Sequence, residues 1–206
     1  YYNSLRLINR DGGTDGIYNK NYVVPNEFEE GYLMYGADAP LIRTDFGKAA
    51  GVICFDLNFE ELRNRYRDQK PELLIFSSMF HGGVLQQVWA TVCRCFLVGS
   101  VRGLPCTVVD PLGRVVASST NYSRYVTSVI NLDYELVHLD HHAAKLRAAK
   151  EKYKTGIKIT DPGHMAYVML SSESEDVTAA QVLEEFEIEP LDRYLERAAR
   201  LRQSNL

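Results

Sequence analysis

Residues 49–62 contain the feature that most constrains the fold, a short apolar run followed at once by a helix signal. The run from Ala49 to Phe55 is rich in β-branched residues and does not alternate with polar ones. This pattern is typical of a strand that is covered on both faces. Asn58 and Glu61 then have the spacing of a capping box, which predicts a helix from Asn58 to about Asp68.

Cys54 lies near the carboxyl end of this predicted strand, just before the predicted helix. In open α/β sheets that edge is where ligands bind. A thiol near a helix N-terminus can have its pKa lowered and act as a nucleophile. The alternative is that Cys54 is a small buried hydrophobic residue, which is common for a free cysteine.

The rest of the chain predicts a mixed sheet covered by helices. Strands are expected at residues 4–9, 16–22, 41–44, 72–76, 96–101, 106–109, 115–118 and 126–132, and further helices at 84–95, 140–153, 178–186 and 190–202. Residues 25–36 are expected to form an acidic loop, and residues 171–176 a polar linker. The last helix is amphipathic and is expected to pack on the domain or on another subunit.

Composition narrows the classes of partner. A net charge of −4 over 206 residues argues against nucleic acid or an anionic membrane surface. The sequence contains no apolar run near the ~20 residues of a membrane span. The four cysteines form neither a disulfide framework nor a CxxC metal site, so we expect a reducing compartment and a cytoplasmic protein.

Lys20 and the glutamates Glu27, Glu29 and Glu30 could complete a reactive centre with Cys54. A carboxylate can take the proton of a thiol, and an ammonium group can stabilise the oxyanion formed when the thiolate attacks a carbonyl or nitrile. The alternative for Lys20 is a snorkelling side chain among tyrosines and valines. The alternative for the glutamates is a solvated loop.

Four segments resemble the carbon–nitrogen hydrolase (nitrilase) superfamily, in the order typical of that family. They are YNKNYVVPNE (Tyr18–Glu27), DFGKAAGVICFDLNFEELR (Asp45–Arg63), LLIFSSMFHGG (Leu73–Gly83), and the Trp89 helix with the CTVVDPLGRVVASS hairpin (Cys106–Ser119). The resemblance covers roughly residues 3–153. It implies a four-layer α-β-β-α sandwich, incomplete at the N-terminus, in which residues 1–166 form the C-terminal portion of the hydrolase domain and residues 167–206 a helical extension.

The resemblance also implies roles for individual residues. Cys54 would be the nucleophile that forms a thioester, and Lys20 would bind the oxyanion together with the backbone N–H of Phe55. Glu27 is the preferred supporting glutamate, with Glu29 and Glu30 as rivals. Phe80 and His81 would line the substrate pocket with Phe55. No cofactor or metal is expected.

The sequence departs from the family pattern in two respects. The general-base glutamate of the family belongs to a segment before the lysine and is absent here, and the helix after Trp89 reads TVCRCFLVGS where family members tend to carry Arg-Ala-x-Glu-Asn-like residues. The favoured function is hydrolysis of a small-molecule amide by a homo-oligomer. Alternatives are a nitrilase, an N-acyltransferase, or a non-catalytic binding or assembly module. A zinc site at His138, His141 and His142 with Asp140 has weaker support: His138 and His142 are four residues apart, but the segment lies at a strand-to-helix junction and has no glutamate inside the pair. A cysteine protease needs a Cys–His pair, and nothing in the sequence ties His81 to Cys54.

Overall fold

The computed structural model describes residues 1–103 and 105–206, and the chain divides into two compact units, residues 1–129 and 130–206. Each unit has its own cluster of buried apolar side chains. The candidate residues for function all lie in the first unit.

The first unit is built on a six-stranded mixed sheet in the order β3-β4-β5-β6-β7-β8. The strands are β3 (Leu41–Arg43), β4 (Lys48–Ile53), β5 (Leu73–Ser78), β6 (Phe96–Val101), β7 (Thr107–Val109) and β8 (Val115–Ser118). Strands β4, β5 and β6 pair in parallel, and the outer pairs are antiparallel. The mixed α/β architecture predicted from the sequence is confirmed.

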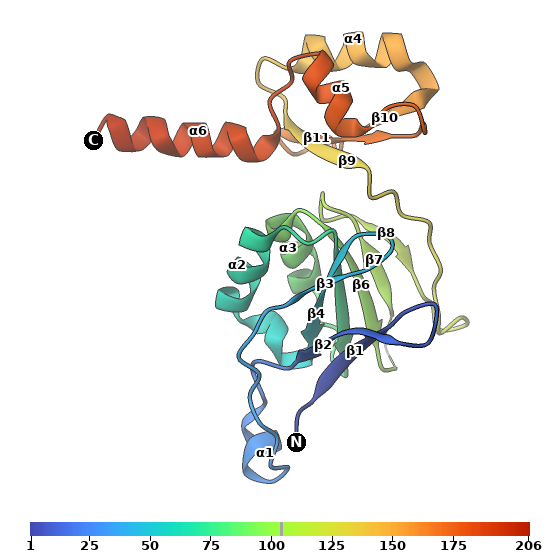
Figure 1. Ribbon diagram of the computed structural model, residues 1–206, viewed down its shortest axis with the longest axis vertical. Coiled ribbons are helices and arrows are strands. Elements are labelled where there is room, and N and C mark those ends of the chain that lie inside the picture. Colours follow the sequence, from blue (N-terminus) through green and yellow to red (C-terminus); the bar gives the residue numbers. More distant parts are fainter. Residues whose placement is uncertain (104) are drawn as a thin grey trace. The chain divides into compact units, whose positions relative to one another are not determined.

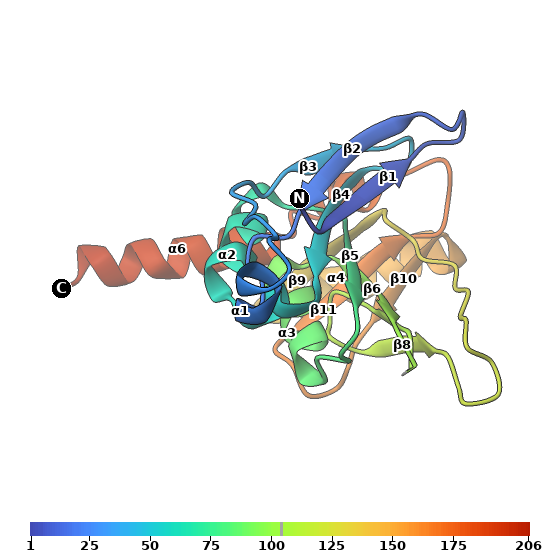
Figure 2. The ribbon, with the colours of Figure 1, turned by 90° about the horizontal axis from the view of Figure 1, so that it is seen from below.

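Helices α2 (Glu60–Gln69) and α3 (Val84–Cys93) cover one face of this sheet, and an antiparallel ribbon of β1 (Ser4–Ile8) and β2 (Thr14–Asn19) covers the other (Figures 1 and 2). From α2, the buried Tyr66 hydroxyl donates to the Gly51 carbonyl of β4 at 2.9 Å. Tyr18 of the ribbon lies so close to Gly51 that a Cβ atom added at Gly51 would be 2.8 Å from the Tyr18 Cβ atom. Gly51 therefore permits the close approach of the ribbon to the sheet.

Several predicted boundaries in this unit are wrong. Helix α2 begins at Glu60, and Phe59 precedes it without a side-chain cap, so the capping box expected at Asn58 is absent. A short helix α1 (Pro25–Glu29) forms within the expected loop. Residues 126–132 form no strand, because their apolar side chains find no neighbouring strand; Val129 is fully exposed.

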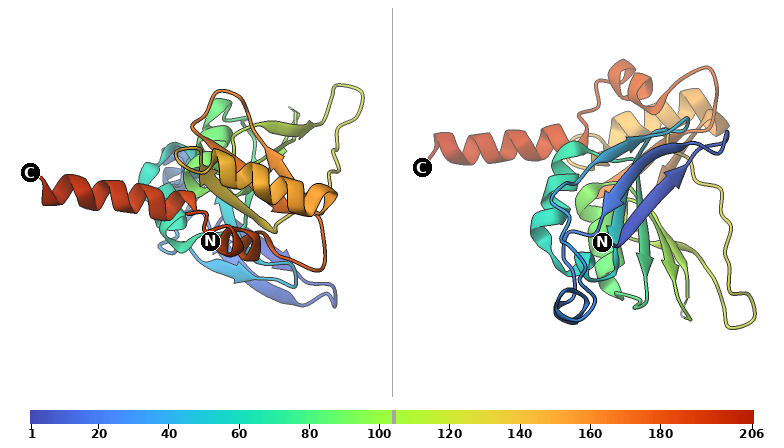
Figure 3. Two further views of the ribbon diagram at one scale, coloured as in Figure 1. Left: turned by 90° about the horizontal axis from the view of Figure 1, so that it is seen from above. Right: turned by 60° about the horizontal axis from the view of Figure 1, so that its bottom comes forward.

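The second unit contains an antiparallel sheet of β9 (Tyr134–His138), β10 (Ile157–Thr160) and β11 (Tyr167–Ser172) in the order β10-β11-β9. Its helices are α4 (Ala143–Tyr153), α5 (Ala179–Glu185) and α6 (Leu191–Ser204), with a 3-10 turn at Lys154–Gly156 (Figure 3). Thr178 and Gln181 form the predicted capping box, which starts α5. Residues 167–206, expected as a helical extension, begin with β11, and the sequence patterns did not predict β10 or β11.

Within the described part of the chain, every helix is too short or too polar to cross a lipid bilayer.

Candidate active site

Cys54 lies where β4 ends and the chain turns abruptly. The strand stops at Ile53, and Cys54 begins a 3-10 turn over Cys54–Asn58 with φ of 50°. A positive φ is unfavourable for a residue with a Cβ atom, and such strain is concentrated at functional sites. The side chain is half-buried and packs at the edge of the apolar core. The turn therefore presents a partly accessible thiol at the carboxyl edge of the sheet.

Asp56 holds this turn against the ribbon. Its fully buried carboxylate accepts hydrogen bonds from the Tyr18 hydroxyl at 2.7 Å, the Tyr22 backbone N–H at 2.7 Å and the Ile53 backbone N–H at 3.0 Å. Burial raises the pKa of Asp56, although these hydrogen bonds and the charge of Lys20 oppose the shift. The carboxylate thus connects the turn that carries Cys54 to the segment that carries Lys20.

Lys20 directly follows β2 and is held on both sides of its backbone. Its N–H donates to the Asn3 carbonyl at 2.8 Å, and its carbonyl accepts from the Gly36 N–H at 2.7 Å. Gly36 cannot be replaced without movement, because a Cβ atom there would lie 2.2 Å from the Asn19 carbonyl oxygen. The chain therefore fixes the direction in which the Lys20 side chain leaves the ribbon.

Lys20 and Glu27 form a buried ion pair. The ammonium Nζ lies 2.6 Å from Glu27 Oε2, with the lysine side chain only 1% exposed and the glutamate 32% exposed. The same carboxylate accepts the Val24 N–H at 3.0 Å, at the start of α1. Burial raises the pKa of Glu27, but the hydrogen bonds from Lys20 and Val24 and the lysine charge outweigh it, so the pKa is lowered. Glu29 and Glu30 are exposed.

The structure thus brings together Lys20 and Glu27 directly, and Lys20 and Cys54 through Asp56. Tyr18 and Tyr22 flank Lys20 in the sequence, and both bond to Asp56, which follows Cys54 by one intervening residue. An ammonium, a hydrogen-bonded carboxylate and a thiol at one sheet edge can bind an oxyanion beside a nucleophile.

Phe55 lies in an aromatic cluster beside the thiol. Its ring packs edge-on to Phe59 at 5.2 Å between centroids, and Phe59 stacks on Tyr22 at 3.6 Å. Phe55 is half-buried. The cluster gives this side of the site an apolar wall.

Phe80 and His81 lie in the loop after β5, and this loop packs on the Cys54 turn. A Cβ atom at Gly82 would lie 2.3 Å from the Leu57 side chain. The His81 carbonyl accepts a hydrogen bond from Gln86, whose Oε1 accepts the Thr107 hydroxyl at 2.6 Å. The buried Gln86 therefore fixes the loop that contains both predicted pocket residues.

Three residues that hold parts of the site in place were not assigned that role from the sequence: Asp56, Gln86 and Trp89. The indole N–H of Trp89 donates to the Leu57 carbonyl at 2.8 Å, which ties α3 to the Cys54 turn. Asp56 could have been noticed as a lone carboxylate in the apolar stretch GVICFDL. Gln86 gives no such signal, because Thr107 lies 21 residues away and the His81 carbonyl reaches Gln86 only through the fold of the loop.

The other thiols and histidines lie in different environments. Cys93 and Cys95 are buried, and burial raises the pKa of Cys95. Cys106 is half-buried like Cys54. His138 stacks on Tyr194 at 4.1 Å, and His142 accepts the Glu189 N–H at 2.9 Å. Among the residues that the structure describes, no group of three or more potential ligands could hold a metal ion.

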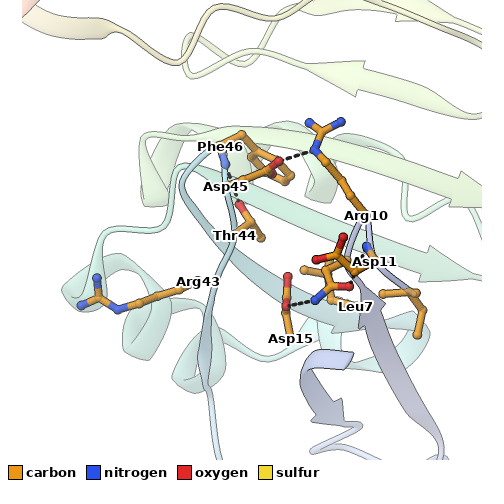
Figure 4. Close-up of a pocket in the computed structure, with 10 residues that line it drawn as sticks. Leu7, Arg10, Asp11, Asp15, Arg43, Thr44, Asp45 and Phe46 are labelled. Atoms are coloured by element: carbon orange, nitrogen blue, oxygen red, sulfur yellow. Dashed lines mark hydrogen bonds and ion pairs between the residues drawn. The ribbon is translucent and has the colours of Figure 1, made fainter. Parts of the chain in front are cut away.

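A second cleft of about 420 Å³ lies at the opposite end of the ribbon, where the β1–β2 turn meets the β3–β4 turn (Figure 4). Arg10 and Asp45 form an ion pair across it, and Arg43, Asp11 and Asp15 add further charges. The apolar side chains of Leu7, Ile8 and Phe46 also line this cleft, and Cys54 does not.

A family model described as carbon-nitrogen hydrolase matches residues 1–138 of the chain. A deaminated glutathione amidase of Rattus norvegicus is 29% identical over 145 residues, which span 57% of this chain and 43% of the amidase. A probable nitrilase of Schizosaccharomyces pombe is 30% identical over 77 residues, or 37% of this chain and 28% of that protein.

The crystal structure of Saccharomyces cerevisiae Nit3, a member of branch 10 of the nitrilase superfamily, is similar to the chain with a TM-score of 0.51 and 25% identity. The similarity covers 57% of this chain and 49% of Nit3. The chain therefore spans about half the length, or less, of the relatives that it matches.

Proposed function

Because the chain belongs to the carbon–nitrogen hydrolase family, we propose that it hydrolyses a small-molecule amide through a thioester on Cys54. The observation that carries the proposal is the buried Lys20–Glu27 pair, together with the Asp56 carboxylate that links the segment around Lys20 to the strained turn presenting the Cys54 thiol. Burying a lysine is costly even when it is paired, and Lys20 is 1% exposed with its charge paired to Glu27. A charged pair buried in this way is a candidate functional group.

In the proposed reaction, the Cys54 thiolate attacks the amide carbonyl carbon, and the carbonyl oxygen becomes an oxyanion. Lys20 Nζ and the Phe55 backbone N–H donate to that oxyanion. The C–N bond then breaks, the nitrogen takes the proton that the thiol gave up and leaves as an amine, and a thioester remains on Sγ. Water attacks the thioester, which yields a carboxylic acid and the free thiol.

Glu27 supports the ammonium group in this scheme. Its lowered pKa keeps it ionised at neutral pH, so it orients Lys20 and maintains its positive charge. The acidic residues that precede Lys20 are Asp11 and Asp15, which lie at the opposite end of the ribbon. We therefore assign the proton acceptor for the thiol to a carboxylate outside this pair of strands.

The proposed substrate is a small neutral amide, bound between Phe55 on one side and the Phe80–His81 loop on the other. The aromatic cluster of Phe55, Phe59 and Tyr22 favours an apolar acyl group. A nitrile would react by the same nucleophile, and an amine in place of water would give acyl transfer. A homo-oligomer in the cytoplasm stays a prediction.

The first test is the rate at which iodoacetamide alkylates each cysteine at neutral pH, read by peptide mass analysis. Cys106 is the matched reference because it is half-buried like Cys54, whereas Cys93 and Cys95 are shielded. We expect alkylation at Cys54 first, slowed by an amide that the protein hydrolyses and absent in Cys54→Ser. Equal rates at Cys54 and Cys106, with no amide hydrolysed, would favour a binding or assembly module instead.

A further inference from the structure

We propose that Asp56 is a positioning residue for this reaction, whose carboxylate fixes the thiol of Cys54 and the ammonium of Lys20 relative to one another. The effect on kinetics that we expect from this role rests on the proposed function. The hydrogen-bond geometry of Asp56 is independent of it. Asp56 belongs to the turn itself, and its hydrogen bonds reach across to the ribbon.

The two carboxylate oxygens together accept hydrogen bonds from both segments. Oδ1 accepts the Tyr22 N–H at 2.7 Å, and Oδ2 accepts both the Tyr18 hydroxyl at 2.7 Å and the Ile53 N–H at 3.0 Å. Ile53 is the residue before Cys54, and Tyr18 and Tyr22 lie on either side of Lys20. One side chain therefore contacts the residue next to Cys54 and two residues that each lie two positions from Lys20.

All three partners are donors, so the site requires a group that only accepts. An ionised carboxylate has no N–H and can accept from each of them, whereas an asparagine amide would direct its own N–H at one donor. The negative charge is fully buried, and the nearby Lys20 charge compensates part of that cost.

A positioning role predicts a loss of rate without a matching loss of substrate binding. If Asp56 sets the alignment of thiol and ammonium, weakening its hydrogen bonds lowers kcat and the reactivity of Cys54, while KM stays nearly constant. A misplacement of about 1 Å is enough to cost on the order of 100-fold in rate. A residue that only stabilises the fold would leave the kinetics of the folded protein unchanged.

Tyr18→Phe and Tyr66→Phe form a matched pair for the test. Both tyrosines are fully buried in the same core, with ring centroids 6.4 Å apart. The Tyr18 hydroxyl donates to Asp56 and accepts from Asn21, while the Tyr66 hydroxyl donates to the Gly51 carbonyl. Each variant loses a buried hydroxyl, but only Tyr18→Phe changes Asp56.

We expect Tyr18→Phe to slow alkylation of Cys54, relative to Cys106, by about 10-fold, the loss of one hydrogen bond to a charged group. The value of kcat for an amide should fall by a similar factor, with KM within about 2-fold. Tyr66→Phe should leave both rates within about 2-fold of the parent chain. Asp56→Asn, where it folds, should lower both rates by about 100-fold.

Equal behaviour of the two tyrosine variants would overturn the positioning role, even in a protein that hydrolyses amides well. Conversely, a parent chain that hydrolyses none of the amides tested would remove the proposed function alone. The alkylation contrast between Tyr18→Phe and Tyr66→Phe still decides the role of Asp56 in that case, because it requires no substrate.

Discussion

The two ends of the β1–β2 ribbon each contain one cation paired with one carboxylate, but in opposite environments. At the carboxyl end, the Lys20 side chain is 1% exposed and Glu27 is 32% exposed. At the other end, Arg10 is 83% exposed and Asp45 is 53% exposed. The same kind of ion pair is thus built into the core at one end and solvated at the other.

This difference in burial decides what each pair can contribute. An exposed pair gains little, because water and salt screen the charges. A buried pair is held firmly, since breaking it leaves an uncompensated charge in a poorly hydrated site. Positive φ falls on Gly12 and Gly47 at the exposed end and on Cys54 at the buried end, and of these three residues only Cys54 has a Cβ atom.

The largest contrast is expected in catalysis. Lys20→Gln should lower kcat for the amide substrate by about 10² to 10³, because it removes one donor to the oxyanion. Arg10→Gln should leave kcat unchanged within about 2-fold. The measurement is the single-turnover rate of acyl-enzyme formation. A comparable loss in both variants would show that the two ends do not differ as their burial indicates.

Stability should differ in the same direction. Glu27→Ala should lower the free energy of unfolding by about 2 to 3 kcal/mol, toward the low end of the range for buried pairs because Glu27 is partly exposed. Asp45→Ala should change it by less than about 0.5 kcal/mol. Urea unfolding followed by tryptophan fluorescence would report both, since Trp89 is buried in this unit. Equal losses would contradict the distinction.

At the strained turn, a substitution is expected to relieve strain, and its effect on stability is smaller than that of Glu27→Ala. Cys54→Gly should be more stable than Cys54→Ala by about 1 kcal/mol, because only glycine adopts a positive φ without a steric penalty. Both variants lack the thiol, so the difference isolates the backbone. Thermal denaturation of the pair is the measurement, and an alanine variant at least as stable as the glycine variant would argue against the strain.

A pH series gives the smallest effect. The pKa of Glu27 lies below its ordinary value of 4.5, so its contribution to stability is present above pH 4.5 and is lost as the pH falls through the folded-state pKa. Glu27→Gln should therefore flatten the fall in unfolding free energy below pH 4.5. Urea midpoints measured from pH 5 to about pH 3 would test this, and parallel curves for parent and variant would exclude the linkage.

The sequence predicted the strand that leads to Cys54, but not where it ends. The apolar run to Phe55 indicates burial, yet the strand stops at Ile53 because Cys54 turns to positive φ. The Asn58 side chain donates to the Phe55 carbonyl instead of capping a helix. Local sequence patterns indicate burial and secondary-structure propensity. The position of this turn depends instead on Asp56, whose partners Tyr18 and Tyr22 lie far away in the chain.

The candidate site shows the same limit. The family resemblance suggested Glu27 as the partner of Lys20, and the structure places them in contact, although their chemical roles stay predictions. The role of Gln86 could not be predicted, because a glutamine in an amphipathic helix is usually a surface residue. Its burial depends on hydrogen bonds with Thr107 and the His81 carbonyl that form only in the folded chain. The expected strand at 126–132 failed for the converse reason, since a β-type sequence needs a neighbouring strand to pair with.

The two amide protons that the Asp56 carboxylate accepts can show by hydrogen exchange whether the ribbon and the Cys54 turn are in contact. Ile53 lies three residues from Asp56, so its amide proton can stay protected while the ribbon detaches, whereas the Tyr22 amide proton loses its acceptor as soon as the two segments separate. A two-stranded ribbon is only marginally stable by itself, and such elements open before the rest of a domain unfolds. Hydrogen exchange at Tyr22 faster than at Ile53 would therefore measure how often the lysine leaves the thiol in the native protein.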